Sequence, residues 1–236
     1  MRLSRLGFLT AGAMFFTANL ALAVTTYTET FNTDTANWRK NVKTVSLDYS
    51  GSGGPDSSGY VTTGYAFSDT ASSIPALFRG HNEYDASGDA FVGNWQSPNG
   101  ITHLTAYVRH NVPQPMSFIL RVAVSANSPA VAFDLPVSQL VQPNTWTPIE
   151  FDVSFSNPLR TNEGANTLAF YNNVLQNVGN VQIGIRLPTT LTNGTSASTT
   201  YTYDLDNVTT NVPEPAGFLL MLAGVAGVGF ARQRKR

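Results

Sequence analysis

The sequence contains no cysteine among its 236 residues. This absence excludes a disulfide scaffold and any zinc or thiol site that is built on cysteine. Charged residues are also scarce: they make up 12 % of the chain, about half of the usual share in soluble domains. Hydrophobic residues reach 42 % and the net charge is only −1, so the composition disfavours an intrinsically disordered chain. The length leaves room for one medium domain or two small ones.

The chain also has no excess of basic residues over acidic ones. The chain has 14 Lys and Arg against 15 Asp and Glu, so a basic nucleic-acid-binding surface is not expected. Two of these basic residues lie in residues 1–23 and four lie in residues 212–236, whereas the one acid in these two segments is Glu214. Residues 24–211 therefore hold eight basic and fourteen acidic residues, a net charge of −6. The sequence predicts an acidic domain between two basic ends.

The N-terminal segment has the three parts of a secretory signal peptide. Arg2 and Arg5 precede an uncharged run, which ends on Ala21-Leu22-Ala23. A basic region, an apolar region and small residues at the first and third positions of the last triplet are typical of a cleaved leader. We predict cleavage after Ala23; the alternative is an uncleaved membrane anchor.

The C-terminal segment also has three parts. Val212, Pro213, Glu214 and Pro215 precede an uncharged run over residues 216–231. Sixteen residues in a helix extend about 24 Å, less than the ~30 Å of a bilayer core, which favours a marginal or transient span. The positive-inside rule places the basic cluster after this run in the cytoplasm. That cluster consists of Arg232, Arg234, Lys235 and Arg236.

This tail resembles the PEP-CTERM sorting signal of Gram-negative bacteria, over about the last 25 residues. The resemblance implies recognition by an exosortase, which would process the chain near residues 213–215. It also implies passage through the inner membrane, followed by release to the cell surface or to an exopolysaccharide matrix. Gly217 stands where the family often has a small hydroxyl residue. The alternative is a plain C-terminal membrane anchor.

Residues 24–211 are dominated by alternation of apolar and polar residues, which predicts strands with one face buried and one in water. Breaks rich in Gly, Pro, Asn and Ser separate these runs, which is typical of an antiparallel sandwich. A helical repeat between Leu168 and Val178 predicts one short helix over an edge. We therefore expect an all-β fold, an antiparallel β-sandwich with one short helix. The alternating runs cover residues 104–109, 116–124, 149–155 and 181–187.

The order of the elements resembles the jelly-roll sandwiches of galactose-binding-like and carbohydrate-binding modules. The resemblance rests on an early strand over residues 28–31 and a final strand over residues 203–208. It implies that these two strands are adjacent and that Glu29, Asp204 and Asp206 hold a structural calcium ion. Two acids on one strand face are unfavourable unless water or a cation compensates them, so simple solvation is the alternative.

Catalytic motifs are not evident, and we assign no catalytic residues. A glycosidase needs two carboxylates about 5 to 10 Å apart, and Glu150 and Asp152 on one strand face have such a spacing. Glu83 and Asp85 lie in a loop with Asp89. The carboxylate oxygens of this loop suit calcium, and the alternative is a polar surface turn without a metal. These acids keep a surface polysaccharide hydrolase open as an alternative.

Sugar recognition combines an exposed aromatic ring with polar side chains. We name Trp38, Tyr84 and Trp95 as ligand-binding candidates because they lie near loops or strand ends, and we expect Trp146 in the core. The leading hypothesis is an exported, non-catalytic surface or matrix protein whose sandwich binds exopolysaccharide or envelope partners. A purely structural matrix protein is the third possibility.

Overall fold

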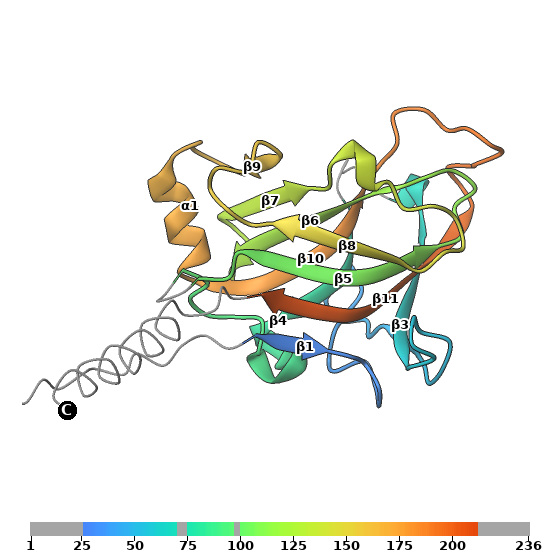
Figure 1. Cartoon of the computed structure of the whole chain (residues 1–236), viewed down its shortest axis with the longest axis horizontal. Helices are drawn as coiled ribbons and strands as arrows, with labels where there is room; N and C mark the ends of the chain where they lie inside the picture. Colours follow the sequence, from blue (N-terminus) through green and yellow to red (C-terminus); the bar gives the residue numbers. More distant parts are fainter. Residues whose placement is uncertain (1–25, 70–74, 97–99, 212–236) are drawn as a thin grey trace, which may run out of the picture.

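The computed structural model describes residues 26–69, 75–96 and 100–211, and within them two antiparallel sheets pack face to face (Figure 1). Sheet A has the order β2-β3-β11-β5-β8, with β1 paired to β11. Sheet B has the order β4-β10-β6-β7-β9. The predicted antiparallel sandwich is therefore confirmed. The strands of sheet A are β1 (Tyr27–Glu29), β2 (Asp48–Ser50), β3 (Tyr60–Ala66), β5 (His103–His110), β8 (Thr147–Asp152) and β11 (Thr200–Asn211). Those of sheet B are β4 (Ala76–His81), β6 (Ser117–Val124), β7 (Ala130–Asp134), β9 (Arg160–Asn162) and β10 (Val178–Arg186).

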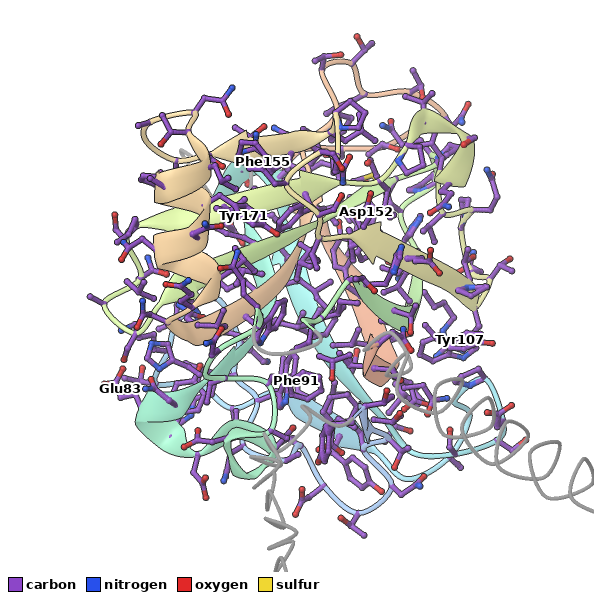
Figure 2. All side chains as sticks on the ribbon, turned by 60° about the vertical axis from the view of Figure 1, so that its left-hand side comes forward. Glu83, Phe91, Tyr107, Asp152, Phe155 and Tyr171 are labelled. Carbon is purple, nitrogen blue, oxygen red and sulfur yellow. The ribbon has the colours of Figure 1, made fainter. Side chains whose placement is uncertain are left out.

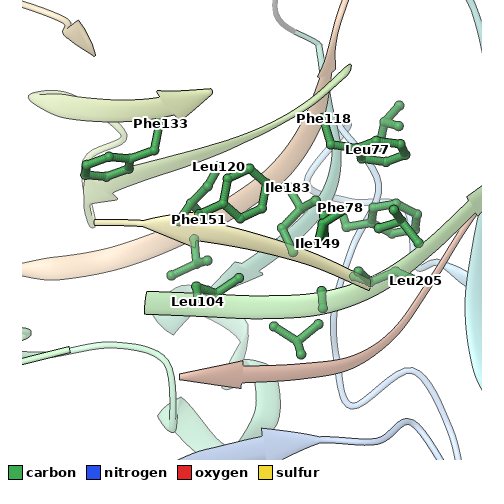
Figure 3. Close-up of a cluster of buried hydrophobic side chains, with 14 of the residues drawn as sticks. Leu77, Phe78, Leu104, Phe118, Leu120, Phe133, Ile149, Phe151, Ile183 and Leu205 are labelled. Atoms are coloured by element: carbon green, nitrogen blue, oxygen red, sulfur yellow. The ribbon is translucent and has the colours of Figure 1, made fainter. Parts of the chain in front are cut away.

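The core lies between the two sheets. Alternation places every second side chain of each strand inside, because successive residues of a strand point to opposite faces. Side chains of β6 and β10 meet those of β5 and β8 in this layer (Figure 3). Leu104, Leu120, Phe118, Phe151 and Ile183 are all buried there.

The first and last strands of the described domain are neighbours, as the jelly-roll resemblance implied. β1 pairs antiparallel with β11, with Thr28 opposite Thr209. The two threonine hydroxyls also form a hydrogen bond of 2.9 Å. This pairing joins the beginning and the end of the domain in one sheet.

The predicted helix is present and ends earlier than expected. Helix α1 (Leu168–Leu175) begins at the N-cap Thr167, whose hydroxyl accepts a hydrogen bond from the Phe170 amide. It lies at one end of the sandwich (Figure 1), where the Tyr171 hydroxyl donates to the Val153 carbonyl at 2.5 Å. Val178, which we expected in the helix, instead starts β10, because its backbone pairs with Gly93 and Val124.

Short 3-10 helices connect several strands. They are η1 (Phe67–Asp69), η2 (Asn82–Tyr84), η3 (Ala86–Asp89) and η4 (Val137–Gln139). Among the described residues, no helix is long and apolar enough to cross a membrane.

The two sorting segments lie outside the described residues. This applies to the signal peptide with Ala21 and Ala23, to the motif at Val212–Pro215, and to the run 216–231 with its basic end. The predictions about cleavage, membrane passage and export therefore stay predictions.

Candidate functional site

The outer face of sheet A carries a row of polar side chains across its central strands. Val61, Leu205 and Val108 point into the core, so their chain neighbours Thr62, Asp204 and Arg109 point away from it. The register places these three side by side: Asp204 of β11 lies between Thr62 of β3 and Arg109 of β5. A charged pair is therefore fixed at the centre of the sheet.

Arg109 connects this row to two aromatic rings. Its Nε donates to Asp204 Oδ2 at 2.7 Å. Its guanidinium carbon lies 4.6 Å from the ring centre of Trp146 and 5.1 Å from that of Tyr60. The two rings meet edge to face at 5.4 Å, and Trp146 Nε1 donates to the Gly53 carbonyl at 2.9 Å. We call Tyr60, Tyr107, Trp146, Arg109 and Asp204 the aromatic face.

One oxygen of this cluster has an unused acceptor site. The Asp204 side chain is only 7 % exposed, and its Oδ1 has no hydrogen-bond partner among the described residues. A buried polar atom without a partner costs free energy. A hydroxyl donor from a ligand would satisfy it, and hydroxyls are what a sugar offers.

A hollow lies next to the aromatic face, over β5, β8 and β11. Its volume is about 210 Å³, and its lining includes Tyr107, Glu150, Thr105 and Thr209. Tyr107 is paired across the sheet with Asp206 and with Pro148, so its side chain shares their outer face. An aromatic ring, two hydroxyls and a carboxylate around one hollow match the mixed apolar and polar lining of a sugar site.

Asp206 is buried two residues further along β11. It is 0 % exposed, and it accepts hydrogen bonds from the Ser58 hydroxyl at 2.7 Å and from the Asn207 amide. Gly54 lies so close that a Cβ there would come within 2.8 Å of Asp206 Oδ2. Burial, helped by the nearby charges of Asp56 and Glu29, raises the pKa of Asp206 to about 6, although the hydrogen bonds from Ser58 and Asn207 act in the opposite direction.

Because the pKa of Asp206 is raised, the free energy of unfolding is expected to fall as the pH rises. In the unfolded chain the carboxyl titrates near 3.9, so the folded state binds the proton more tightly. The loss in free energy of unfolding that comes from ionising Asp206 is absent below about pH 4. It grows between pH 4 and 6 and reaches its full size above pH 6. We expect Asp206→Asn to raise the free energy of unfolding by about 2 kcal/mol at pH 7.5 and to change it little at pH 4.

Urea unfolding of both proteins at the two pH values, in the presence of a chelator, measures this difference. Asp48→Asn is the matched control, because Asp48 is an exposed strand acid that pairs with Lys40. A wild-type protein as stable as Asp206→Asn at pH 7.5 would contradict the assignment.

The three acids of the expected calcium site have separate protein partners. Asp204 binds Arg109, and Asp206 binds Ser58. Glu29 accepts from the Phe31 amide at 3.0 Å and from the Tyr27 hydroxyl. Within the described ranges, no group of three or more His, Asp or Glu side chains is arranged to hold a metal ion.

The three aromatic residues named from the sequence lie elsewhere. Trp38 is 0 % and Trp95 is 2 % exposed, so both rings are core residues and neither offers a face to a ligand. They are buried because the loops that carry them fold over the end of the sandwich, where Trp95 Nε1 donates to the Phe91 carbonyl. Tyr84 is half-buried; it stacks on His81 and lies under Arg39.

The four acids of the hydrolase alternative are divided between two sites. Glu150 and Asp152 lie on edge strand β8 of sheet A, where Glu150 is 3.7 Å from His103. Glu83 and Asp85 follow β4 of sheet B, and Glu83 pairs with Lys43. Glu83 and Asp152 lie apart in Figure 2, so the two pairs do not converge in one groove. Asp89 ends η3 and is exposed.

Trp146 was also placed wrongly from the sequence, in the opposite sense to Trp38 and Trp95. We expected it in the core, but it is half-buried on the outer face, against Tyr60 and Arg109. The signal was present in the alternation: Ile149, Phe151 and Val153 point inward. The even-numbered residues of the same strand therefore point outward, and Trp146 has their parity.

Comparisons with known proteins add little. No family model matches the chain, and no curated protein matches it. Among solved structures, one match comes from the structural analysis of an exo-beta-agarase, with a TM-score of 0.40 and 12 % identity. The match covers 82 % of this chain and 25 % of that one, so this chain spans about a quarter of that protein. A likeness at this level carries no conclusion about function.

Proposed function

We propose that this is an exported, exosortase-processed protein of the cell surface or extracellular matrix, and that its sandwich binds exopolysaccharide without catalysing a reaction. The export part is supported by the two sequence signals alone: the leader ending at Ala23 and the tail that begins at Val212. Its partners on this route would be the secretion machinery, the exosortase and, transiently, the inner membrane. Fractionation of cells that carry the chain with and without residues 212–236 tests this route; equal surface release from both would contradict it.

The binding part is supported by one observation above all, the aromatic face. Trp146 and Tyr60 provide ring surface of the kind that stacks on a sugar, and Arg109 holds both rings in place. The unpaired Asp204 Oδ1 provides an acceptor for a sugar hydroxyl. The hollow beside Tyr107 provides space for a neighbouring unit of the polymer.

We expect Trp146→Ala to weaken binding to the producer's exopolysaccharide at least tenfold. Removing the indole takes away the largest ring of the aromatic face and leaves Arg109 without one of its two cation–π partners. Affinity electrophoresis or calorimetry with the purified polysaccharide measures the loss. A tenfold change corresponds to about 1.4 kcal/mol.

The matched control is Tyr49→Ala. Tyr49 is an exposed aromatic residue of the same sheet, but its register partner is the inward-pointing Val61, so it lies on the other face. This variant is expected to bind like the wild type. Equal affinity of Trp146→Ala and wild type would refute the aromatic face as the binding site, and failure of all glycans to bind would refute the proposed function.

A further inference from the structure

A hollow at the α1 end of the sandwich is lined mainly by apolar surface. Its volume is about 520 Å³, within the range of ~300 to 1,000 Å³ that is usual for ligand pockets. β8 and β11 end on this side and β5 begins there, as their pairing and Figure 1 show. The hollow therefore lies where three strands of sheet A reach the end of the sandwich. Its lining includes Trp95, Ile101, Thr102, Ser154, Phe155 and Tyr171.

The apolar lining of this hollow is held in place by contacts within the protein. Trp95 is 2 % and Ile101 is 7 % exposed, so they form the floor, whereas Phe155 is half-buried and forms a wall. The Phe155 ring meets Tyr171 edge to face, with ring centres 5.4 Å apart, and Figure 2 shows both beside α1. The Arg160 guanidinium lies 4.4 Å from the Phe155 ring centre. A surface that is already ordered loses little conformational entropy when a segment docks on it.

The described chain ends at the edge of the hollow. Asn211 pairs with His103 of β5, and the Asn211 carbonyl accepts from the Thr102 amide at 3.0 Å. Thr102 is itself a lining residue. The Asn211 side chain donates to the Thr105 hydroxyl on the outer face, at 3.4 Å. Alternation therefore predicts that the next side chain, Val212, points inward, toward the hollow.

Residues 212–215 are long enough to cross the hollow. β11, β5 and β8 are neighbours in sheet A. Adjacent strands are about 4.8 Å apart, so Asn211 lies about 10 Å from the end of β8. Four extended residues span about 13 Å. The segment therefore reaches Ser154 and Phe155, which follow β8.

The composition of residues 212–215 suits an apolar groove. Val212, Pro213 and Pro215 are apolar, and the two prolines carry no N–H, so the segment brings only two backbone donors that need a partner. Each proline also restricts the residue before it to extended conformations, which lowers the entropy that docking removes. Extended proline-containing segments bind in grooves lined by aromatic side chains.

The N-terminal end of the mature chain does not fit the hollow. β1 pairs with β11 on the side away from β5, so β11 and β5 lie between β1 and the hollow. After the predicted cleavage at Ala23, only Val24 and Thr25 precede Thr26. Two residues extend at most about 7 Å, which is too short to cross two strands. The segment after Asn211 is therefore the one that the geometry favours.

We propose that this hollow is the docking site for residues 212–215 of the same chain, with Val212 and the two prolines against its apolar lining. The inference goes beyond the proposed function, because docking needs neither a sugar nor an exosortase. One consequence rests on the proposed export route. The docked segment is covered at the place where the exosortase would act, so it has to leave the hollow before processing.

Cysteine cross-linking in the full chain, produced without exosortase, tests the docking, since the chain has no cysteine of its own. We expect Glu214→Cys to form a disulfide with Ser154→Cys about tenfold faster than with Thr26→Cys. Thr26 is the matched control, because it is exposed and directly precedes β1, the neighbour of β11. It lies nearer to Asn211 than Ser154 does, so an undocked tail would react with Thr26→Cys at least as fast.

Two changes test the lining and the segment separately. Phe155→Ala removes a wall of the hollow and is expected to slow cross-linking to Ser154→Cys several-fold. Phe170→Ala is its matched control, because Phe170 is another half-buried ring of the α1 end but does not line the hollow. Pro213→Ser combined with Pro215→Ser is expected to slow cross-linking as well. These two positions lie outside the described domain, so this variant tests the docking even if Phe155→Ala fails to fold.

The outcomes separate docking from export. Equal rates with Ser154→Cys and Thr26→Cys, or an unchanged rate in the double proline variant, would overturn the docking and leave the export proposal standing. Fast cross-linking together with equal surface release with and without residues 212–236 would refute the export route alone. In cells with the exosortase, Phe155→Ala is expected to speed up processing and Phe170→Ala to leave it unchanged. Equal processing in both would overturn the proposed covering of the motif.

Discussion

Replacing Trp38 by alanine is expected to lower the free energy of unfolding by about 3 to 5 kcal/mol, the range for large aromatic residues in cores. The indole is fully buried and packs edge to face against Phe31 and Phe91, at centroid distances of 5.8 and 5.5 Å. Its Nε1 donates to the Ser87 hydroxyl at 2.8 Å, and its ring lies against Gly80 of β4. The change removes all of these contacts and leaves a cavity.

Urea unfolding followed by circular dichroism measures this loss. Trp146→Ala is the control for the removal of a tryptophan. It is expected to lower the free energy of unfolding distinctly less than Trp38→Ala, because Trp146 lies half-buried on an outer face. If the two substitutions cost the same, Trp38 would not be the core residue that this structure describes.

Asn127→Ala is expected to lower the free energy of unfolding by about 1 to 3 kcal/mol. Its Oδ1 accepts from Arg79, Arg121 and Asn180, and the Gln182 amide oxygen accepts from the same three donors, so the substitution removes one of two shared acceptors from this buried network. Each unsatisfied buried donor costs about 1 to 3 kcal/mol. The backbone of Asn127 also has a φ of 68°, in the left-handed region where alanine is less favourable than asparagine.

Two further variants separate these causes. Asn193→Ala changes an exposed asparagine with a similar φ of 55°, so it reports the backbone cost alone. Asn127→Asp keeps an acceptor and places a negative charge beside two guanidinium groups, so it is expected to retain most of the stability. Thermal unfolding of the three variants is the measurement, and equal losses in Asn127→Ala and Asn193→Ala would contradict the network's role.

The strands that the sequence predicts are those in which apolar residues alternate with mostly polar residues or glycine. β5 and β8 alternate in burial as well, whereas β6 and β10 were predicted from the same alternation although most residues on both of their faces are buried. β4 and β7 were not predicted, because their sequences show no period-two pattern and nearly all of their residues are buried. Ala130 and Ala132, for example, face outward but are still covered.

The residues that form the candidate sites could not be predicted from the local sequence pattern alone. Trp146 could be placed on the outer face by its parity with Glu150, whereas its contact with Tyr60 depends on how two distant strands pair. The side-by-side placement of Arg39, Arg79, Gln182 and Arg121 on sheet B depends even more on register, since these residues come from four separate segments. Local pattern predicts which face a side chain takes, but the neighbours across a sheet are set by topology.

Hydrogen–deuterium exchange of the protein with and without its exopolysaccharide tests the central claim most directly, because it locates the bound polymer on the sandwich. We predict slower exchange in β5, β8 and the loop at residues 51–59, which adjoin Trp146 and Asp206, and loss of this protection in Trp146→Ala. Protection confined to the α1 end of the sandwich, or exchange that the polysaccharide leaves unchanged, would contradict a binding site on sheet A.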